Sequence, residues 1–537
     1  MEILNVKNLI FSYPDTYGDY PKKALNDISF SVSGGEMVMF MGRSGCGKTT
    51  LLRLLKSELA PFGNIQGEIN IVNSSEIGFV MQNPDSQTVC DDVYGELCFG
   101  LENMGLSPEE ISRRVGETVC YFGIEHLMGR EIHTLSGGEK QLVCLCSVMA
   151  MGPEILILDE PVSRLDPAHA ESFAAVLARL NRELGTTVIM AEHFCEGLFH
   201  LCDKIAFLEE GKLMYFGEPQ KAVLSRGFEI FCPAAARLAL GVGVTDNIPI
   251  TVREGRDFLS VNFAPQKVDL KSVPACHESV LECMDLYFRY ERQLPNIISA
   301  AEFCLYRGEI CTLTGSNGAG KTTFLKCLGG ILHAVSGKIK VFGKPVKSYK
   351  NGSLYRECIG ILPQNPYDLF VKSSVREDCE YAVKAMGYDM TDIHKTAEML
   401  GITHLMDTHP RDLSGGEAQL CGLCRVLLCR PKILLLDEPV KALDPYSTRR
   451  FGEVLLRLKE SGMSVLMISH NLEFAAEYSD RCVMFFGGKI AGGGSPHEFF
   501  SHNRFFTTAA SRISRGYIEN AVTVSQLCDA LNGEVKQ

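Results

Sequence analysis

The 537 residues of this chain contain the same ordered set of motifs twice. The repeated motifs are GRSGCGKTT at 42–50 and GSNGAGKTT at 315–323, LSGGE starting at Leu135 and Leu413, and LDEP starting at Leu158 and Leu436. The copies are offset by 273 residues at the first motif and by 278 at the other two. Because a block repeated in this way is one folding unit used twice, we expect two copies of one domain.

The repeat continues beyond these motifs and suggests the domain boundaries. ARLALG, ending at Gly241, resembles SRISRG, ending at Gly516. The residues between the copies have balanced charges and several prolines, which is typical of a small subdomain with a linker. We predict a first domain at 1–231, an appendage and linker at 232–280, a second domain at 281–505 and a second appendage at 506–537.

Composition narrows the functional classes. A formal net charge of -12 disfavours a protein that coats nucleic acid with a basic face, because phosphate binding needs clustered Lys and Arg. No uncharged apolar run reaches the roughly 18 residues needed to cross a bilayer, so a membrane role would require a partner chain that supplies the span. MEILNVKNLIF, at the start, shows no export signal, and we expect the 21 scattered cysteines to be reduced cytosolic thiols.

Short apolar runs alternate with amphipathic stretches in each copy. The runs of the first copy are 37–41, 76–80, 155–159 and 187–193, and those of the second are 310–315, 358–363, 433–437 and 464–470. Continuous apolar strands of this length suit a sheet that is covered on both faces. We therefore predict an α/β fold.

The first repeated motif has the pattern GxxxxGK[ST], which binds nucleotide phosphates. Its glycines let backbone N–H groups wrap a phosphate, its Lys reaches the outer phosphates and its hydroxyl holds Mg²⁺. Lys48 and Lys321 are therefore predicted to bind the phosphates of ATP, and Thr49 and Thr322 to ligate the metal. The other predicted ATP-binding residues of the loops are Gly42, Ser44, Gly45, Gly47, Thr50, Gly315, Asn317, Gly318, Gly320 and Thr323.

Each LDEP motif ends an apolar run with two adjacent carboxylates. A carboxylate at the tip of a buried strand is costly unless a cation accompanies it, and Mg²⁺ on a nucleotide is such a cation. Asp159 and Asp437 are the predicted metal ligands. Glu160 and Glu438, one residue further on, are predicted to polarise the attacking water as catalytic residues.

The order of the motifs is more specific than any one of them, since LSGGE alone would indicate only a helix start capped by Ser. A phosphate loop, LSGGE, LDEP and then a His after one more strand is the order found in ATP-binding cassette (ABC) ATPases. The chain resembles that family over essentially all of both halves. The resemblance implies two tandem P-loop NTPase domains that hydrolyse ATP, each with a helical signature subdomain and a short C-terminal appendage.

The resemblance assigns roles to further residues. Tyr13 and Tyr290 resemble the aromatic residue that stacks on adenine, although an ordinary tyrosine at a strand edge is the alternative. Gln82 and Gln364 resemble the glutamine that touches both Mg²⁺ and the attacking water.

Two more pairs follow from the same resemblance. His193 and His470 resemble the catalytic switch histidine at the γ-phosphate. Asp166 in SRLDP and Asp444 in KALDP lie in segments that resemble the loop that crosses the interface between paired domains.

In this family each nucleotide lies between the phosphate loop of one domain and the LSGGE segment of the other. The resemblance thus implies intramolecular pairing of the two ATPase domains. One site would combine Lys48, Thr49, Gln82, Asp159, Glu160 and His193 with Ser414 and Gly416. The other would combine Lys321, Thr322, Gln364, Asp437, Glu438 and His470 with Ser136 and Gly138. Neither set lacks a member, so both sites are predicted to hydrolyse ATP.

The chain resembles a fused pair of the ATPases of energy-coupling factor (ECF) transporters, which import vitamins or transition-metal ions. That resemblance implies a transmembrane coupling subunit and a substrate-binding membrane subunit as partners, no nucleic acid, and a peripheral location on the cytoplasmic face of the cell membrane. The alternatives are the ATPase of a sugar or other ABC importer and a soluble tandem-cassette ATPase that acts on ribosomes or DNA.

The two copies differ after the predicted loop glutamines. The first copy reads QNPDSQTV and the second QNPYDLFV, and Arg164 and Lys441 occupy neighbouring places that also differ. We therefore expect the halves to present different surfaces to a single membrane partner. Charge reversal at Asp85 and substitution of Tyr367 should then affect assembly unequally.

Overall fold

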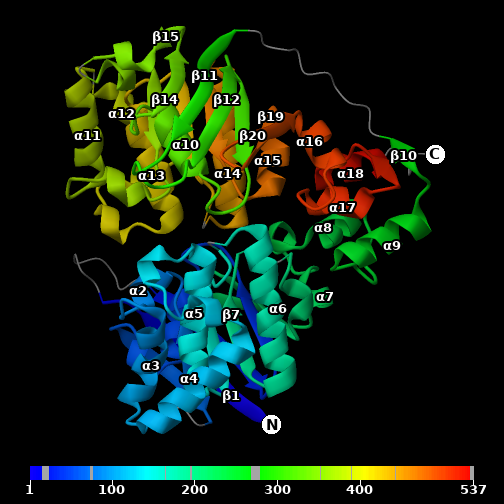
Figure 1. Ribbon diagram of the computed structural model, residues 1–537. Helices are drawn as coiled ribbons and strands as arrows, with labels where there is room; N and C mark the ends of the chain where they lie inside the picture. Colours follow the sequence, from blue (N-terminus) through cyan, green and yellow to red (C-terminus); the bar gives the residue numbers. More distant parts are fainter. Residues whose placement is uncertain are drawn as a thin grey trace. The chain divides into compact units, whose positions relative to one another are not determined.

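The computed structural model describes residues 1–14, 23–72, 77–163, 165–193, 196–267, 278–350, 352–388, 390–441 and 443–532. The chain divides into two compact units, unit 1 (Met1–Thr251) and unit 2 (Val252–Gln537), whose helices and strands are labelled in Figure 1. Each unit contains one copy of the repeated motifs.

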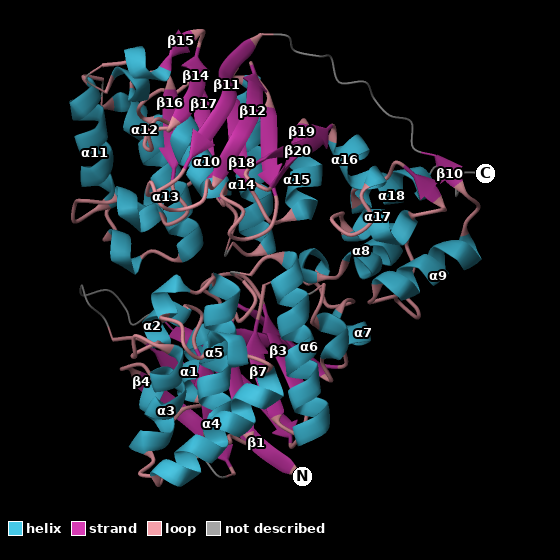
Figure 2. Cartoon of the chain, in the orientation of Figure 1, coloured by secondary structure: helices cyan, strands magenta, loops and turns pink. Residues whose placement is uncertain are grey.

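Unit 1 combines a mixed sheet with an antiparallel sheet (Figure 2). The mixed sheet has the order β5-β6-β7-β3-β8-β9, in which only the pair β8 and β9 is antiparallel. Its strands are β3 (Met37–Met41), β5 (Ile77–Val80), β6 (Ile155–Asp159), β7 (Thr187–Ala191), β8 (Lys204–Glu209) and β9 (Lys212–Gly217). The antiparallel sheet, in the order β2-β1-β4, consists of β1 (Glu2–Ser12), β2 (Lys23–Ser33) and β4 (Asn64–Ile71).

The helices of unit 1 connect and cover these strands. They are α1 (Lys48–Leu54), α2 (Pro84–Gln87), α3 (Val93–Asn103), α4 (Pro108–Phe122), α5 (Gly137–Ala150), α6 (Pro167–Leu184), α7 (Pro219–Ala222) and α8 (Ala234–Gly241). Side chains of α3, α4 and α5 form a hydrophobic cluster of their own, which includes Leu97, Val115 and Val143. This cluster is the core of the helical subdomain that was predicted to carry LSGGE.

Unit 2 repeats the same architecture. Its mixed sheet has the order β16-β17-β18-β13-β19-β20, and its antiparallel sheet the order β12-β11-β14-β15. The strands are β11 (Ser279–Phe288), β12 (Ile298–Tyr306), β13 (Ile310–Thr314), β14 (Ser336–Val341), β15 (Lys344–Pro345), β16 (Ile359–Leu362), β17 (Ile433–Asp437), β18 (Ser464–Ile468), β19 (Arg481–Phe486) and β20 (Lys489–Gly494). The helices that accompany them are α10 (Lys321–Leu328), α11 (Val375–Met386), α12 (Thr391–Leu400), α13 (Gly415–Leu427), α14 (Pro445–Glu460), α15 (Leu472–Tyr478) and α16 (Pro496–His502).

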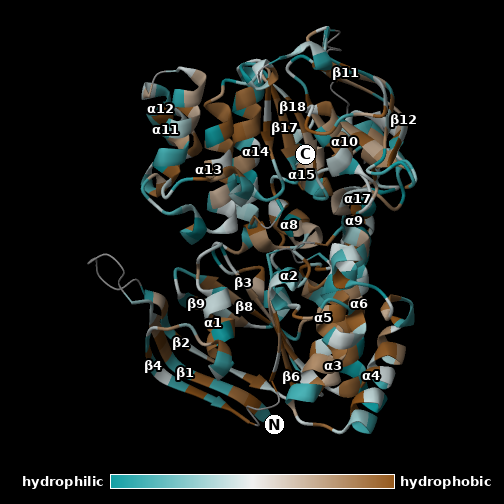
Figure 3. Cartoon of the chain, turned by 60° about the vertical axis from the view of Figure 1, so that its left-hand side comes forward, coloured by the Kyte–Doolittle hydropathy of each residue, from teal (hydrophilic) through white to brown (hydrophobic). Residues whose placement is uncertain are grey.

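Both faces of the mixed sheets are covered, which explains why their strands are continuous apolar runs. In β17, Leu434 and Leu436 pack with residues of α13 and α14, whereas Ile433 and Leu435 pack with α10 and the antiparallel sheet. Figure 3 shows β17 and β18 in hydrophobic colours. Every strand expected from an apolar run forms within two residues of its expected bounds in the described residues, and the prediction of two tandem α/β domains is confirmed.

The helices that follow the two copies do not all stay with their own copy. Helix α8 belongs to unit 1, whereas α9 (Val252–Asn262), from the predicted first appendage, packs against α17 (Ala509–Ser514) within unit 2. Strand β10 (Gln266–Lys267) pairs in parallel with β21 (Ile518–Glu519), and α18 (Val524–Asn532) follows. Part of the sequence between the copies therefore contributes to the fold of unit 2.

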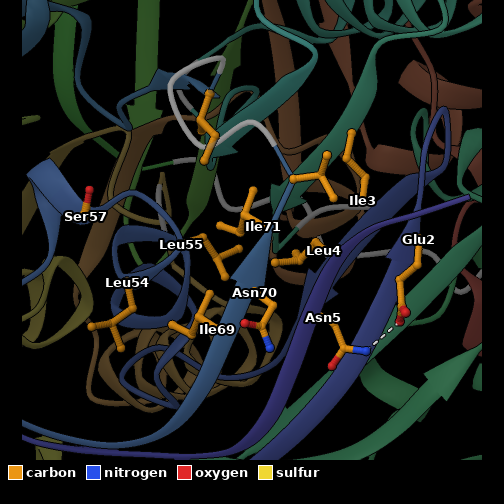
Figure 4. Close-up of a pocket in the computed structure, with 12 residues that line it drawn as sticks. Glu2, Ile3, Leu4, Asn5, Leu54, Leu55, Ser57, Ile69, Asn70 and Ile71 are labelled. Carbon is orange, nitrogen blue, oxygen red and sulfur yellow. Dashed lines mark hydrogen bonds between the residues drawn. The ribbon is translucent and has the colours of Figure 1, made fainter.

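Unit 1 has a cavity of about 540 Å³ that none of the predicted site residues lines. It lies between β1, β4 and the end of α1, and Figure 4 shows Leu55, Ile69 and Ile71 along it.

In unit 2 the connection between β14 and β16 is longer than the corresponding connection between β4 and β5 in unit 1. There Leu354 is buried in the core, and the Tyr355 hydroxyl donates to the Gly329 carbonyl at 3.0 Å.

Candidate functional site

The phosphate loop of each unit joins a central strand to a helix that begins at the motif lysine. In unit 1 the loop follows β3 and α1 begins at Lys48, directly after Gly47 in a left-handed conformation. Gly42 has φ of 148°, and a Cβ there would lie 2.2 Å from the Leu208 carbonyl oxygen. Gly315 is in the same position in unit 2, with φ of 147°. Only glycine fits at these two places.

The motif lysines are buried and held by the loop itself. The Lys48 ammonium donates to the carbonyl oxygens of Gly42, at 2.8 Å, and Arg43, at 3.1 Å. Lys321 donates to Gly315 at 3.0 Å and to the following carbonyl at 2.7 Å. Each lysine is only 5% exposed. A buried ammonium group whose hydrogen bonds go to neutral carbonyls is well placed to attract an anion such as a nucleotide phosphate.

The rest of each loop lies beside the lysine. Ser44 and Gly45 in unit 1, and Asn317 and Gly318 in unit 2, form the turn between strand and helix. Gly320 has a left-handed φ of 98° and directly precedes the helix, as Gly47 does.

The predicted metal ligands meet at the strand end. Thr49 Oγ1 donates to Asp159 Oδ1 at 3.0 Å, and Thr322 Oγ1 donates to Asp437 Oδ1 at 3.1 Å. Burial, reinforced by the neighbouring Glu160, raises the pKa of Asp159 to about 6. Burial raises the pKa of Asp437 to about 6 as well. A buried carboxylate beside a hydroxyl supplies the hard oxygen ligands that Mg²⁺ prefers, so these residues fit the metal.

The two predicted catalytic glutamates have an unusual backbone. Glu160 and Glu438 follow β6 and β17 with φ of 48° and 50°, which costs a residue other than glycine on the order of 1–3 kcal/mol. Their N–H groups donate to Ala191 and Ile468, at 2.9 and 3.0 Å, and so fix the strained turn to the neighbouring strand. Strain that the surrounding fold maintains at this place is a reason to look for function there.

In unit 1 the glutamate carboxylate is held from two sides. Gln82 Nε2 donates to Glu160 Oε2 at 2.6 Å, and His193 Nε2 lies 2.8 Å from Glu160 Oε1. Burial alone would raise the pKa of Glu160, but His193, Lys48 and Gln82 outweigh it and lower that pKa. The carboxylate is therefore kept ionised, as a group that polarises water must be.

In unit 2 a third residue joins the same arrangement. Gln364 Nε2 lies 3.2 Å from Glu438 Oε2, and His470 Nε2 lies 3.3 Å from Glu438 Oε1. Lys441 Nζ lies closer than either, 2.6 Å from Glu438 Oε2. Burial is opposed here by His470 and Lys441, which together lower the pKa of Glu438 to about 2. Arg164, the residue singled out in the first copy, lies outside the described residues.

The predicted adenine-stacking tyrosines lie beside the phosphate loops. The Tyr13 hydroxyl is 2.9 Å from Thr50 Oγ1, and the Tyr290 hydroxyl is 3.1 Å from Thr323 Oγ1. Tyr13 is 39% exposed and Tyr290 57% exposed, so part of each ring is open to solvent. Each ring also makes an edge contact with a phenylalanine two residues earlier, in the strand that precedes the tyrosine. This position fits a base on the exposed part of the ring, and the role in stacking stays a prediction.

The LSGGE segments begin helices at other places in the units. Ser136 caps α5 and Ser414 caps α13, each in a reciprocal pair with the glutamate three residues later. Gly138 and Gly416 lie in the first turns of these helices. A Cβ at Gly138 would lie 2.8 Å from the His169 ring.

The predicted interface-loop aspartates also cap helices. Asp166 caps α6 by accepting from the His169 N–H. Asp444 caps α14 by accepting from the N–H groups of Tyr446 and Ser447.

Within each unit, then, the fold brings together the phosphate loop and the metal, glutamine, glutamate and histidine positions. The LSGGE serines start separate helices, and their pairing with the opposite phosphate loop stays a prediction. Sequence reasoning noticed Lys441 but not its contact with Glu438. The signal was available, because Lys441 stands three residues after the glutamate, where the first copy has Ser163.

The segments after the loop glutamines contact the LSGGE regions differently in the two units. In unit 1, Lys140 of α5 pairs with Asp85 of α2 at 2.6 Å. In unit 2, the Tyr367 hydroxyl donates to the Leu413 carbonyl at 2.8 Å. The two positions expected to differ at a docking surface thus also connect two parts of their own unit.

Comparisons with known proteins agree with the repeated architecture. A family model described as ABC transporter matches residues 25–163 and 298–441, one stretch in each copy. A candidate ABC transporter ATP-binding protein of Bacillus cereus is 36% identical over 546 residues, covering 98% of this chain and 97% of that protein. YkoD of Bacillus subtilis, named as a candidate HMP/thiamine import ATP-binding protein, is 32% identical over 527 residues, with 93% of each chain covered.

A solved structure is also similar to part of the chain. The protein cbiO1 of Clostridium perfringens, described as part of the ABC transporter complex cbiONQ, is 27% identical with a TM-score of 0.39. That alignment covers 42% of this chain and 92% of the other. In the described part of the chain, no helix has both the length and the hydropathy that crossing a membrane requires.

Proposed function

Because this chain belongs to the ABC transporter family, as an ATP-binding protein with two tandem cassettes, we propose that it energises an ECF-type importer of a vitamin or transition-metal ion. The observation that carries this proposal is the end-to-end similarity to YkoD, whose name links it to HMP/thiamine import. The chain is an ABC transporter ATPase. What is proposed is the class of importer, its partners and the roles of individual residues.

We assign the chemistry to residues that already lie together in each unit. The ammonium group of Lys48 or Lys321 would exchange its carbonyl partners for the outer phosphates. The carboxylate of Glu160 or Glu438 would orient and polarise the attacking water. The neighbouring glutamine and histidine contacts would hold that carboxylate in place. Thr49 with Asp159, and Thr322 with Asp437, would hold the Mg²⁺ that accompanies the nucleotide, and the metal would supply positive charge at the phosphates.

The halves are proposed to work as a pair. Ser414 and Gly416 would complete the site around Lys48, and Ser136 and Gly138 the site around Lys321. ATP bound in this way would draw the halves together, and loss of the γ-phosphate contacts would let them separate. Since both halves are on one chain, pairing would occur at high effective concentration.

The proposed partners are a transmembrane coupling subunit and a substrate-binding membrane subunit, with this chain on the cytoplasmic face. The test is mass spectrometry of proteins that copurify with the tagged chain from detergent-solubilised membranes. A coupling subunit together with a small substrate-binding membrane protein is the expected result. Copurification of ribosomes instead would exclude the proposal.

The contacts after the loop glutamines lead to a prediction about assembly. Asp85→Lys places two ammonium groups together at Lys140, whereas Tyr367→Phe removes only the hydrogen bond to Leu413. We expect Asp85→Lys to weaken binding to the membrane partners more strongly than Tyr367→Phe does. The measurement is the amount of coupling subunit retained per tagged chain.

The control for this prediction is the exchanged pair Asp85→Lys with Lys140→Asp. If the ion pair within unit 1 matters, the exchanged pair should retain more partner than Asp85→Lys alone. An exposed ion pair contributes only about 0–1 kcal/mol, so the expected differences are a few-fold. Equal retention by Asp85→Lys and Tyr367→Phe would contradict the expected asymmetry.

A further inference from the structure

The two catalytic centres differ at one position that contacts a glutamate carboxylate. Lys441 Nζ lies 2.6 Å from Glu438 Oε2, with 21% of the lysine side chain and 8% of the glutamate side chain exposed. Such a shielded ion pair is weakened little by dissolved salt. The lysine lies three residues after the glutamate, in the turn between β17 and α14.

The corresponding position in unit 1 is Ser163, which does not reach the carboxylate. Its hydroxyl donates to the backbone carbonyl of Glu160 at 3.0 Å. Glu160 Oε2 instead accepts from Gln82 at 2.6 Å. The two glutamates thus have different nearest partners. For Glu160 it is the neutral amide of Gln82, and for Glu438 it is the charged amine of Lys441.

The other contacts of the glutamate change with the lysine. The distance from glutamine Nε2 to carboxylate Oε2 rises from 2.6 Å in unit 1 to 3.2 Å in unit 2. The distance from histidine Nε2 to carboxylate Oε1 rises from 2.8 to 3.3 Å. The glutamine and histidine of unit 2 therefore lie further from Glu438 than their counterparts in unit 1 lie from Glu160. The nearest partner of the Glu438 carboxylate is Lys441.

These distances matter for the reaction because the carboxylate must face water. An ammonium group in a charge-assisted hydrogen bond takes up one carboxylate oxygen and draws electron density from it. The carboxylate is then less able to accept a hydrogen bond from an attacking water. In each catalytic cycle the carboxylate must also break its contact with the lysine, or contact the lysine and the attacking water together.

We propose that Lys441 makes the two halves unequal, holding the Glu438 carboxylate in an ion pair so that the second copy hydrolyses ATP more slowly than the first. Lys441 is a positioning residue, since it acts through Glu438. The inference rests on the proposed role of the two glutamates in hydrolysis. It also predicts that a lysine at either of the equivalent positions 163 and 441 slows hydrolysis by the copy that carries it, and that a serine there does not.

The test compares reciprocal substitutions in the full chain. Lys441→Ser gives the second copy the residue of the first, and we expect kcat for ATP to rise by up to about twofold, because the faster first copy already supplies most of the turnover, while KM changes little. Ser163→Lys gives the first copy the ion pair, and we expect kcat to fall several-fold. Lys441→Arg keeps a cation at the same place and should keep the wild-type rate.

The effect should also be visible in each copy separately. In a Glu160→Gln background, where the second copy alone carries its glutamate, Lys441→Ser should raise hydrolysis by about tenfold, equivalent to about 1.4 kcal/mol in the barrier. In a Glu438→Gln background, Ser163→Lys should lower hydrolysis by a similar factor. Binding of a fluorescent N-methylanthraniloyl ATP, measured in parallel, shows that each variant is folded.

Two outcomes would overturn the proposal. One is that Lys441→Ser binds the fluorescent nucleotide normally but leaves kcat unchanged or lower. The other is that Lys441→Arg and Lys441→Ser have the same effect, which indicates that the charge is not involved. If Glu160→Gln with Glu438→Gln retains wild-type hydrolysis, the proposed role of the glutamates fails instead, whatever substitutions at Lys441 do.

Discussion

Replacing both strand-end glutamates by glutamine, as Glu160→Gln with Glu438→Gln, is expected to lower kcat for ATP by about 10³-fold. Glutamine keeps the size of the side chain but cannot act as the charged acceptor that polarises water, and positioned acid–base groups contribute about 10²–10⁴-fold. Nucleotide binding should remain, because the phosphate loops are unchanged. The measurements are steady-state phosphate release and equilibrium binding of ATP with Mg²⁺.

The matched control for the glutamates is an exposed residue of the same type. Glu218 pairs with Lys221 on the surface of unit 1, and its side chain is 65% exposed. Glu218→Gln should leave both hydrolysis and binding unchanged. Hydrolysis by the double glutamate variant within tenfold of wild type would contradict the assignment of water activation to these residues.

The second large effect is expected from the phosphate-loop lysines. In Lys48→Ala with Lys321→Ala, each loop loses a buried ammonium group that donates to backbone carbonyls of the loop. A hydrogen bond to a charged group contributes about 1.5–3 kcal/mol, so each site should lose about 10- to 100-fold in ATP affinity. Equilibrium binding of ATP measures this loss directly.

The lysine and glutamate variants therefore separate binding from chemistry. The double lysine variant should lose binding and hydrolysis together, whereas the double glutamate variant should lose hydrolysis alone. Lys221→Ala, which removes a lysine that is 70% exposed, is the matched control and should bind normally. Unchanged ATP affinity in the double lysine variant would contradict the assignment of the phosphate loop.

Much of the fold could be predicted because its signals are local. The apolar runs formed strands close to the expected bounds, and the glycines of the phosphate loop need conformations that other residues avoid. The meeting of Thr49 with Asp159 followed from motif order, since the loop and helix that carry Thr49 follow β3, Asp159 ends β6, and both strands belong to the parallel part of one sheet. Each of these predictions was stronger because the same motifs occur twice in the chain in the same order.

Other features depend on contacts between distant residues and could not be predicted in this way. The packing of α9 on α17 within unit 2 joins segments about 250 residues apart, and no periodicity indicates it. The ion pair between Asp85 and Lys140 depends on how two helices meet. The contact of Lys441 with Glu438 is close in sequence, but its geometry depends on the left-handed turn at the glutamate.

The single variants Glu160→Gln and Glu438→Gln show whether one chain carries two complete hydrolytic sites. Steady-state ATP hydrolysis should fall in both, with the larger loss in Glu160→Gln because Lys441 slows the second copy. Wild-type hydrolysis by Glu160→Gln, together with complete loss in Glu438→Gln, would show that only the second copy hydrolyses ATP and would exclude two working sites.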